Sequence, residues 1–162
     1  MLTEFYINLS QDLSQLLEDA DDYNVNIKVG ENTDTQDFRA HSIILRARSP
    51  YFKRALSSRW TFSKKDGIIL FTKPNISPTI FTLILKYIYS GTLDLIKISR
   101  SDILNLLVAS DELLLDELIE HIQDHLIKRE SQWLKQNSIM VLHTVIKLFS
   151  CKELQEYCLE SI

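Results

Sequence analysis

Alternation of apolar and polar residues predicts short strands in the first half of the chain. In residues 24–30 every second side chain is apolar, as in a strand with one buried face. Residues 38–41 alternate in the same way, and the polar stretch between these two segments is typical of a hairpin loop. A continuously apolar run at 68–71 predicts a third strand, and residues 2–7 suggest a short one at the N-terminus.

Spacings of three and four residues between apolar side chains predict several helices. The first is expected from about residue 8 to Asp19, with a stripe of leucines along one face: Leu9, Leu13, Leu16 and Leu17. Ser49-Pro50 and Ser77-Pro78 each place a capping hydroxyl before a proline at the first helical position. Gly91 follows the second of these helices and is the residue type that most often terminates one.

The order of these elements predicts the fold class. A helix is followed by three strands that a helical hairpin interrupts, and further helices are expected at 101–111 and 114–128. Residues 57–67 are mostly polar and are expected to form a loop before the third strand. Strands and helices do not alternate regularly. We therefore expect an α+β fold in which a small, mainly three-stranded sheet is covered by helices, with additional helices at the C-terminal end.

The composition is that of an ordinary globular domain and argues against several classes of function. Hydrophobic residues make up 45% and charged residues 25% of the 162 positions, which is normal usage for a folded chain. A net charge of −4 argues against nucleic acid as the main partner, because neutralising phosphates requires clustered Lys and Arg. No apolar run is long enough to cross a membrane, and the N-terminus does not resemble a signal peptide. We therefore expect a cytoplasmic or nuclear protein, or both, whose two cysteines stay reduced.

Residues that could support catalysis or metal binding occur only in incomplete arrangements. His121 and His125 are spaced to share one helical face, but neither a third ligand nor the glutamate of an H-E-x-x-H motif accompanies them. His41 stands among apolar residues at a strand-to-helix corner, so we expect a structural role for it. Three glycines cannot form a phosphate-binding loop. We expect no enzymatic activity, no catalytic residue, no metal and no cofactor; a small hydrolase or metal-dependent enzyme that uses these histidines is the alternative.

One segment resembles a known family. Residues 38–56 read FRAHSIILRARSPYFKRAL and match seven spaced positions of the BTB/POZ signature, F-x-A-H-x-x-[IVL]-L-x-x-x-S-x-x-F. The resemblance extends over residues 24–128, through the segments YIYSG at 87–91 and LLVASDEL at 106–113. It implies the BTB/POZ fold and a protein-interaction domain rather than an enzyme.

The resemblance also implies three regions along the chain. Residues 1–20 are expected to form an N-terminal dimerisation helix region, and residues 21–129 the BTB/POZ domain. Residues 130–162 are similar to the opening helices of the BACK module that often follows this domain. The sequence ends too soon for a whole BACK module, so we expect either a natural short form or a truncated chain.

The leucine stripe at 9–17 has two interpretations. It could cover the core of its own chain, or it could pack against a second copy, as the resemblance implies for the N-terminal helix of dimerising members. Several leucines left exposed would promote aggregation, which favours the homodimer. The dimer interface is then expected to join Leu9, Leu13, Leu16 and Leu17 to Ile43, Arg46 and Ala47 of the partner.

A second set of residues is a candidate for binding cullin-3. Trp60 and Phe62 are large aromatic residues in a polar loop, and exposed aromatics are typical of interface anchors. Family members that recruit cullin-3 carry a hydrophobic-x-Glu motif in this loop, and Phe62 replaces its glutamate here. The resemblance adds Leu56 and Tyr89 to the same face. Alternatively, Trp60 folds back onto Leu56.

These residues predict the adaptor part of a cullin-3 ubiquitin ligase, with its substrate bound through a domain that is not in this chain. The alternative is a self-association domain of a scaffold or transcription regulator without cullin binding. Two residues that differ from the family pattern argue against a role as a transcription regulator. Asn24 and Ser42 stand where the transcription-factor branch of the family has charged residues, so capture of a corepressor at that pocket is not expected.

Overall fold

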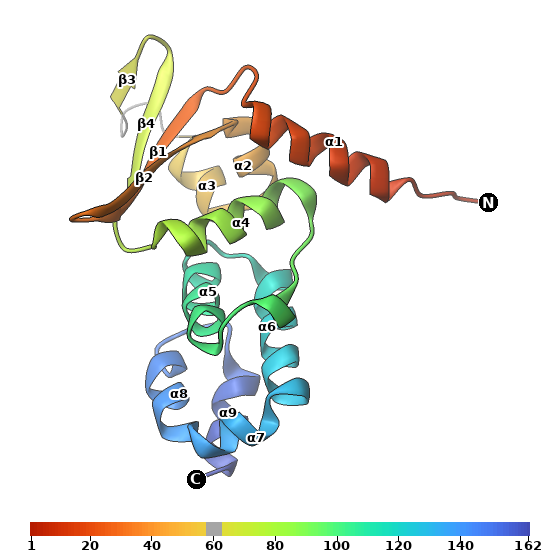
Figure 1. Cartoon of the computed structure of the whole chain (residues 1–162), viewed down its shortest axis with the longest axis vertical. Coiled ribbons are helices and arrows are strands. Elements are labelled where there is room, and N and C mark those ends of the chain that lie inside the picture. Colours follow the sequence, from red (N-terminus) through yellow and green to blue (C-terminus); the bar gives the residue numbers. More distant parts are fainter. Residues whose placement is uncertain (58–62) are drawn as a thin grey trace. The chain divides into compact units, whose positions relative to one another are not determined.

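The computed structural model describes residues 1–57 and 63–162, with the backbone alone at Ser63 (Figure 1). Contacts within the chain divide it into two compact units, Met1–Leu93 and Asp94–Ile162, and each is described by itself. The fold is α+β, as the sequence predicts. None of the helices in the described ranges is long and apolar enough to span a membrane.

A mixed sheet forms the centre of the first unit. Its described strands are β1 (Val25–Glu31), β2 (Asp34–Ala40), β3 (Ser63–Lys65) and β4 (Ile68–Lys73), in the order β2-β1-β4-β3. Strand β1 is antiparallel to β2 and parallel to β4, and β3 pairs antiparallel with β4. The three apolar side chains that alternate along β1 are completely buried. The sequence therefore predicts β1 and β4 closely, but it starts β2 four residues too late, because Asp34–Asp37 are polar, and it misses β3, which lies inside the expected loop.

Helices cover this sheet and fill the rest of the first unit. They are α1 (Tyr6–Asp19), α2 (Ser42–Arg48), α3 (Pro50–Ala55) and α4 (Pro78–Ser90). Helix α4 contacts β1, β2, α2 and α1, and most of its apolar side chains are buried. The predicted caps are present: the Ser49 and Ser77 hydroxyls accept hydrogen bonds from Phe52 and Ile80, and Gly91 ends α4 with a φ of 66°.

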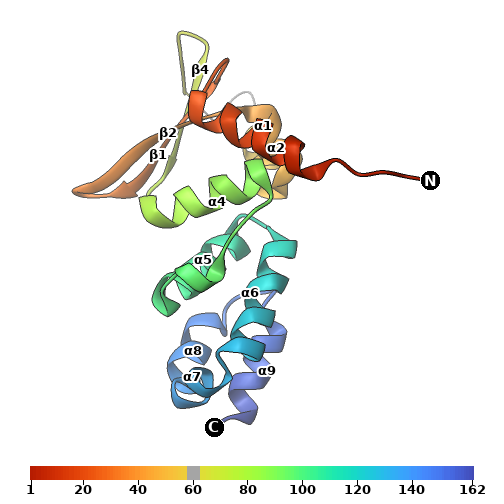
Figure 2. The same ribbon diagram turned by 45° about the vertical axis from the view of Figure 1, so that its right-hand side comes forward.

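The N-terminal segment differs from its predicted structure. Residues 2–5 form no strand, and α1 begins at Tyr6, inside the segment expected to be extended. Ala20 caps the end of α1: its backbone is left-handed, with a φ of 54°, and its N–H donates to the Leu16 carbonyl. Figures 1 and 2 show α1 beside α4, with the residues before α1 leading away from the sheet.

The second unit contains only helices among its described elements. These are a short 3₁₀ turn η1 (Leu95–Lys97), α5 (Arg100–Glu112), α6 (Asp116–Arg129), α7 (Ser131–Gln136), α8 (Ser138–Val145) and α9 (Lys152–Glu160). Ser99 caps α5 by accepting from the Asp102 N–H, so the helix begins one residue before the expected start at 101. Leucines from α5, α6, α7 and α9 are completely buried and form the core of this unit together with both cysteines.

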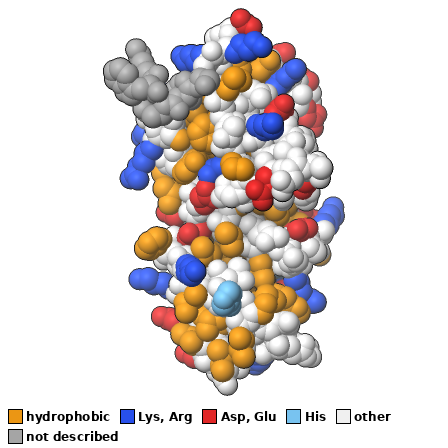
Figure 3. All heavy atoms as spheres, turned by 90° about the vertical axis from the view of Figure 1, so that its left-hand side faces the viewer, with side chains coloured by type: hydrophobic (Ala, Val, Ile, Leu, Met, Phe, Trp, Pro, Cys, Tyr) orange, Lys and Arg blue, Asp and Glu red, His pale blue; other side chains and the backbone are white. Residues whose placement is uncertain are grey.

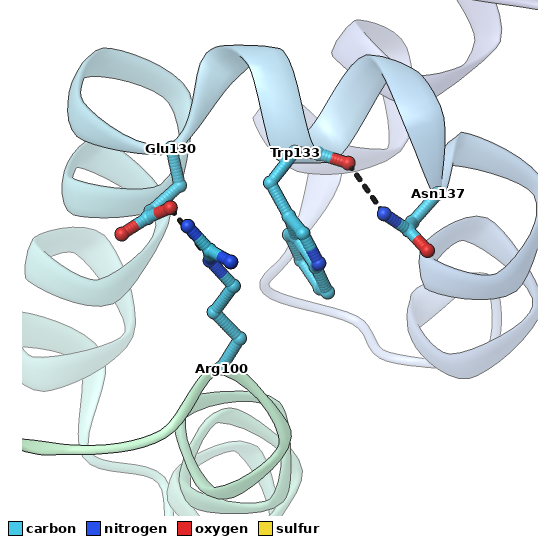
Figure 4. A network of polar contacts seen from close by, with 4 residues as sticks. All are labelled: Arg100, Glu130, Trp133 and Asn137. Carbon is cyan, nitrogen blue, oxygen red and sulfur yellow. Dashed lines mark hydrogen bonds and ion pairs between the residues drawn. The ribbon is translucent and has the colours of Figure 1, made fainter.

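A polar network joins the beginning of α5 to the α6–α7 junction (Figure 4). Arg100 Nε lies 2.8 Å from a Glu130 carboxylate oxygen, and the guanidinium lies 5.6 Å from the centre of the Trp133 ring. The Asn137 amide donates to the Trp133 carbonyl at 2.8 Å. Arg100 therefore holds α5 to a site 30 residues further along the chain. The network joins residues on both sides of the expected domain boundary at 129/130, and all four of its residues belong to the second compact unit.

Candidate functional site

The strand-to-helix corner at His41 is built from hydrogen bonds. The His41 backbone N–H donates to the Tyr89 hydroxyl at 2.8 Å, and the same hydroxyl lies 2.7 Å from Nδ1 of the His41 ring. Nε2 lies 2.5 Å from the Asp21 carbonyl oxygen, which can only accept. In the neutral ring, Nε2 therefore carries the proton and Nδ1 accepts from Tyr89. Both ring nitrogens are occupied by the protein itself, as expected for a structural histidine.

Burial of Tyr89 changes how the candidate cullin face must be interpreted. The Tyr89 side chain is only 2% exposed and that of Leu56 6%, so neither is available to a partner at the surface. Burial raises the pKa of Tyr89 to about 12, against a smaller lowering by the His41 backbone N–H. The expectation that both residues lie on an exposed cullin-binding face is corrected accordingly. Trp60 and Phe62, the other two candidates, lie outside the described residues.

Asn24 and Ser42 are the two neutral residues at positions where charged residues would be needed for corepressor capture. Asn24 Nδ2 donates to the Ser42 hydroxyl, and Asn24 Oδ1 accepts from the Ser42 backbone N–H, both at 2.8 Å. The second bond satisfies an N–H group in the first turn of α2, which its own N-cap side chain leaves without a partner. The two neutral residues therefore bond to each other and stabilise the start of α2.

Helix α1 has one face on its own chain and one face that is more exposed. It contacts α4, and the Ser10 hydroxyl donates to the Ser90 carbonyl at 2.6 Å. The leucines at 13, 16 and 17 are half-buried, whereas Leu9 is 54% exposed. Helix α4 therefore covers part of the leucine stripe, so the aggregation argument for a second copy applies only to the part that α4 leaves exposed. No residue of α1 is fully buried.

Helix α2 presents a complementary exposed face. Leu45 is completely buried under the helix, while Ile43 is 75% exposed on the opposite side. Arg46 and Ala47 lie three and four residues after Ile43, on the same side, and are also exposed. The predicted dimer residues of α1 and α2 are thus at the surface or half-buried, where a second copy could reach them. Further exposed apolar residues lie in the segment that was expected to form a short strand: Leu2, Phe5, Tyr6 and Ile7.

The C-terminal unit has an apolar surface of its own. Ile139, Met140 and Ile146, on or next to α8, are exposed, and Phe149 in the following loop is 90% exposed. Figure 3 shows apolar side chains gathered between basic ones over these helices. The sequence suggests residues 133–149 as an extension of the candidate cullin face, without naming contact residues. It does not identify these four, because a short apolar helix does not reveal which side is covered.

The candidate catalytic and metal-binding residues remain dispersed. His121 is exposed and His125 half-buried on α6, and no group of three or more His, Cys, Asp or Glu side chains in the described ranges could hold a metal ion. Both cysteines are buried and form no disulfide. Burial, with a smaller contribution from Asp111, raises the pKa of Cys151 to about 12, which disfavours a nucleophilic thiolate.

Comparison with known proteins identifies a family and a fold. The model of the BTB/POZ domain family matches residues 10–130. Kelch-like protein 41 of Mus musculus is 36% identical over 87 residues, which cover 54% of this chain and 13% of that protein. BTB/POZ domain-containing protein 9 of Drosophila melanogaster is 28% identical over 120 residues, which cover 74% of this chain and 16% of the relative.

Two solved structures share the fold at low sequence identity. The BTB domain of zebrafish PATZ1 superposes with a TM-score of 0.58 at 23% identity, over 76% of this chain and 95% of that one. The BTB domain of human Gigaxonin gives a TM-score of 0.57 at 20% identity, over 75% of this chain and 93% of that one. The chain therefore spans nearly the whole of these isolated domains but a small part of the curated relatives.

Proposed function

The chain belongs to the BTB/POZ domain family, and from this we propose that it is a homodimeric protein-interaction module serving as the adaptor part of a cullin-3 ubiquitin ligase. The observation that carries the dimer is the pair of exposed faces on α1 and α2, which include Leu9 and Ile43. Burying a leucine or isoleucine contributes roughly 1.5–3 kcal/mol, so covering these residues with a second copy would stabilise an assembly.

A two-fold dimer fits this surface because the two faces differ. In a two-fold interface every contact between different residues occurs twice, so α1 of each copy could lie against α2 of the other. The half-buried leucines of α1 would remain on α4 of their own chain at one edge and meet Ile43 and Ala47 of the second copy at the other. In this arrangement the leucine stripe both covers part of its own chain and packs against the second copy.

Replacing Ile43 tests the dimer. The variant Ile43→Glu would place a charge in the apolar interface, while the fold of each chain should be unaffected because the side chain is already exposed. We expect sedimentation velocity to show a shift toward monomer with an unchanged circular dichroism spectrum. Ile96→Glu is a matched control, since Ile96 is also exposed but lies in the second unit. A dimer unaffected by Ile43→Glu would remove α2 from the interface.

The cullin-3 part of the proposal rests on family resemblance and on the loop at Trp60 and Phe62. If this loop is the docking site, Trp60→Ala should weaken binding of the cullin-3 N-terminal domain by about 2 kcal/mol or more in calorimetry. Phe62→Glu restores the glutamate of cullin-recruiting relatives and should preserve or increase the affinity. Both variants should leave the dimer mass unchanged. Absence of binding by the wild type and by both variants would contradict the adaptor role.

The alternative function is self-association without cullin binding, and the burial of two candidate cullin-binding residues favours it. Tyr89 and Leu56 are buried, and Phe62 stands in place of the motif glutamate, so the cullin face has fewer supports than the dimer face. A self-association domain of a larger scaffold or transcription regulator would need only the surfaces on α1 and α2. In either case we propose a cytoplasmic or nuclear protein, with the C-terminal helices as the start of a BACK-like module and a substrate bound outside this chain.

A further inference from the structure

Charge is segregated along the first unit. Lys28 is the only basic residue among residues 1–37, which otherwise carry Asp and Glu. Asp66 is the only acidic residue among residues 38–93, which otherwise carry Lys and Arg. Helix α1 belongs to the acidic segment, whereas α2 and α3 belong to the basic one. The two exposed faces that define the proposed dimer therefore have opposite charge.

Particular side chains stand out on each face. Asp12 is exposed and lies three residues after Leu9 and four before Leu16, so it belongs to the leucine side of α1. Arg46 is exposed and lies three residues after Ile43, on the apolar side of α2. Each face thus combines apolar side chains with one charge, negative on α1 and positive on α2.

Neighbouring charges are already engaged, unlike these two. Asp19 accepts from the Gln15 amide at 2.8 Å. Arg48 donates to the Ile88 carbonyl at 3.1 Å, and its guanidinium lies over the Tyr87 ring. Among the described residues, Asp12 and Arg46 form neither an ion pair nor a side-chain hydrogen bond within their own chain. Within the described ranges, both are therefore available to pair with another molecule.

We propose that Asp12 of one copy pairs with Arg46 of a second copy, and that this pair, repeated by symmetry, sets the register and the salt dependence of the dimer. The inference rests on the homodimer proposed above and adds its electrostatic part. Complementary charges at the edge of an apolar interface raise the rate of association and disfavour other arrangements. Screening shortens their range to about 10 Å at 0.1 M salt, so the effect should weaken as salt is added.

Charge reversal in a two-fold dimer gives a sharp test. In homodimers of either D12K or R46E, both symmetry-related contacts bring like charges together. In a mixed dimer of D12K with R46E, both contacts bring opposite charges together again. We expect each variant alone to raise the dimer Kd about tenfold or more at 50 mM NaCl. An equimolar mixture should return to within about threefold of the wild type, with the heterodimer identified by native mass spectrometry.

Matched controls use exposed charges of the first unit that are not members of the proposed pair. Glu18→Lys changes another exposed acid of α1, and Lys53→Glu changes an exposed base of α3. Each alters the net charge by the same amount as D12K or R46E. Both controls keep Asp12 and Arg46. Mixing them should therefore not lower the dimer Kd below that of either control alone. Equal rescue by the control mixture would show a general charge effect and overturn the specific pair.

The outcomes separate this inference from the proposed function. If the wild type is a dimer but the D12K and R46E mixture binds no more tightly than the two homodimers, the pair is wrong and the dimer stands. If the wild type stays monomeric at 50 mM NaCl and about 100 μM chain, far above the Kd of a stable dimer, the homodimer itself is wrong. A dimer whose Kd does not change between 50 and about 500 mM NaCl would also overturn the pair.

Discussion

At the scale of single residues, the Tyr89 hydroxyl holds together the corner where β2 meets α2. It accepts from the His41 backbone N–H and donates to the His41 ring, and both groups are buried. Removing it in Tyr89→Phe would leave a buried N–H and a ring nitrogen without partners. We expect a loss of about 1–3 kcal/mol in the free energy of unfolding, measured by urea denaturation.

A second tyrosine provides the control for this variant. Tyr157 on α9 is half-buried, and its hydroxyl makes no hydrogen bond to the described residues. Tyr157→Phe should therefore change the unfolding free energy by less than about 0.5 kcal/mol. Equal effects of the two substitutions would show that the hydrogen bonds at His41 do not stabilise the corner.

The raised pKa of Tyr89 predicts how stability depends on alkaline pH. Its pKa is about 12 in the folded chain, against an ordinary value of 10.0 in an unfolded one. Between these values the unfolded state binds fewer protons, so stability that is fully present below pH 10 is lost as the pH rises through 12. Cys151 should add to the decline from pH 9 upward for the same reason.

Urea denaturation at several pH values between 8 and 12 measures this dependence. The wild type should lose more unfolding free energy over the range than Tyr89→Phe, which has no group to titrate at this position. Parallel pH profiles for the two proteins would contradict the assignment of the decline to Tyr89.

The sequence identifies His41 as structural more readily than Tyr89 as its partner. His41 stands between apolar residues at a visible change of periodicity, which restricts its surroundings. Tyr89 lies in α4, a helix that is apolar around most of its circumference, so spacing does not show which aromatic points inward. The resemblance alone assigned Tyr89 to the candidate cullin face, and spacing gave no independent sign that its side chain is buried.

At the scale of elements, glycine turns and capping serines account for most of the helix and strand ends that the sequence predicts. A glycine turn also connects β3, the strand that the sequence does not predict. Asp66-Gly67 forms the tight turn of the β3–β4 hairpin, with φ angles of 54° and 78°. Asp-Gly is a strong hairpin signal, but it normally stands between alternating apolar residues. Lys64 and Lys65 on β3 are both polar and exposed, so the alternation that would reveal the strand is absent.

The glycines of the two hairpins are expected to differ in how much stability is lost when each is replaced by alanine. Gly30 has a φ of 89°, and a Cβ atom there would lie 2.0 Å from the Asp34 carbonyl oxygen. Gly67 also has a positive φ, but a Cβ atom would meet nothing within 4 Å. Gly30→Ala should destabilise the fold by about 2–3 kcal/mol or more, and Gly67→Ala by about 1 kcal/mol. Thermal denaturation of both variants measures the difference, and equal shifts in Tm would contradict the close approach at Gly30.

At the scale of the whole molecule, the order of helices and strands was sufficient to predict an α+β fold, and the spaced signature at 38–52 pointed to its family. The compact units could not be predicted in the same way, because they divide at 93/94, inside the stretch of residues 10–130 that the family model matches. The expected end of the BTB/POZ domain at 129/130 stays a prediction. The ion pair of Arg100 with Glu130 joins residues far apart in sequence, and no local pattern reveals it.

Sedimentation equilibrium of the wild-type chain tests the central claim most directly. The exposed faces of α1 and α2 predict a reversible dimer, with a mass of about twice the 18.9 kDa of one chain. The dimer should persist at low micromolar concentration in 50 mM NaCl, as expected for an interface with an apolar centre. A single species of 18.9 kDa at every concentration up to about 100 μM would contradict the account.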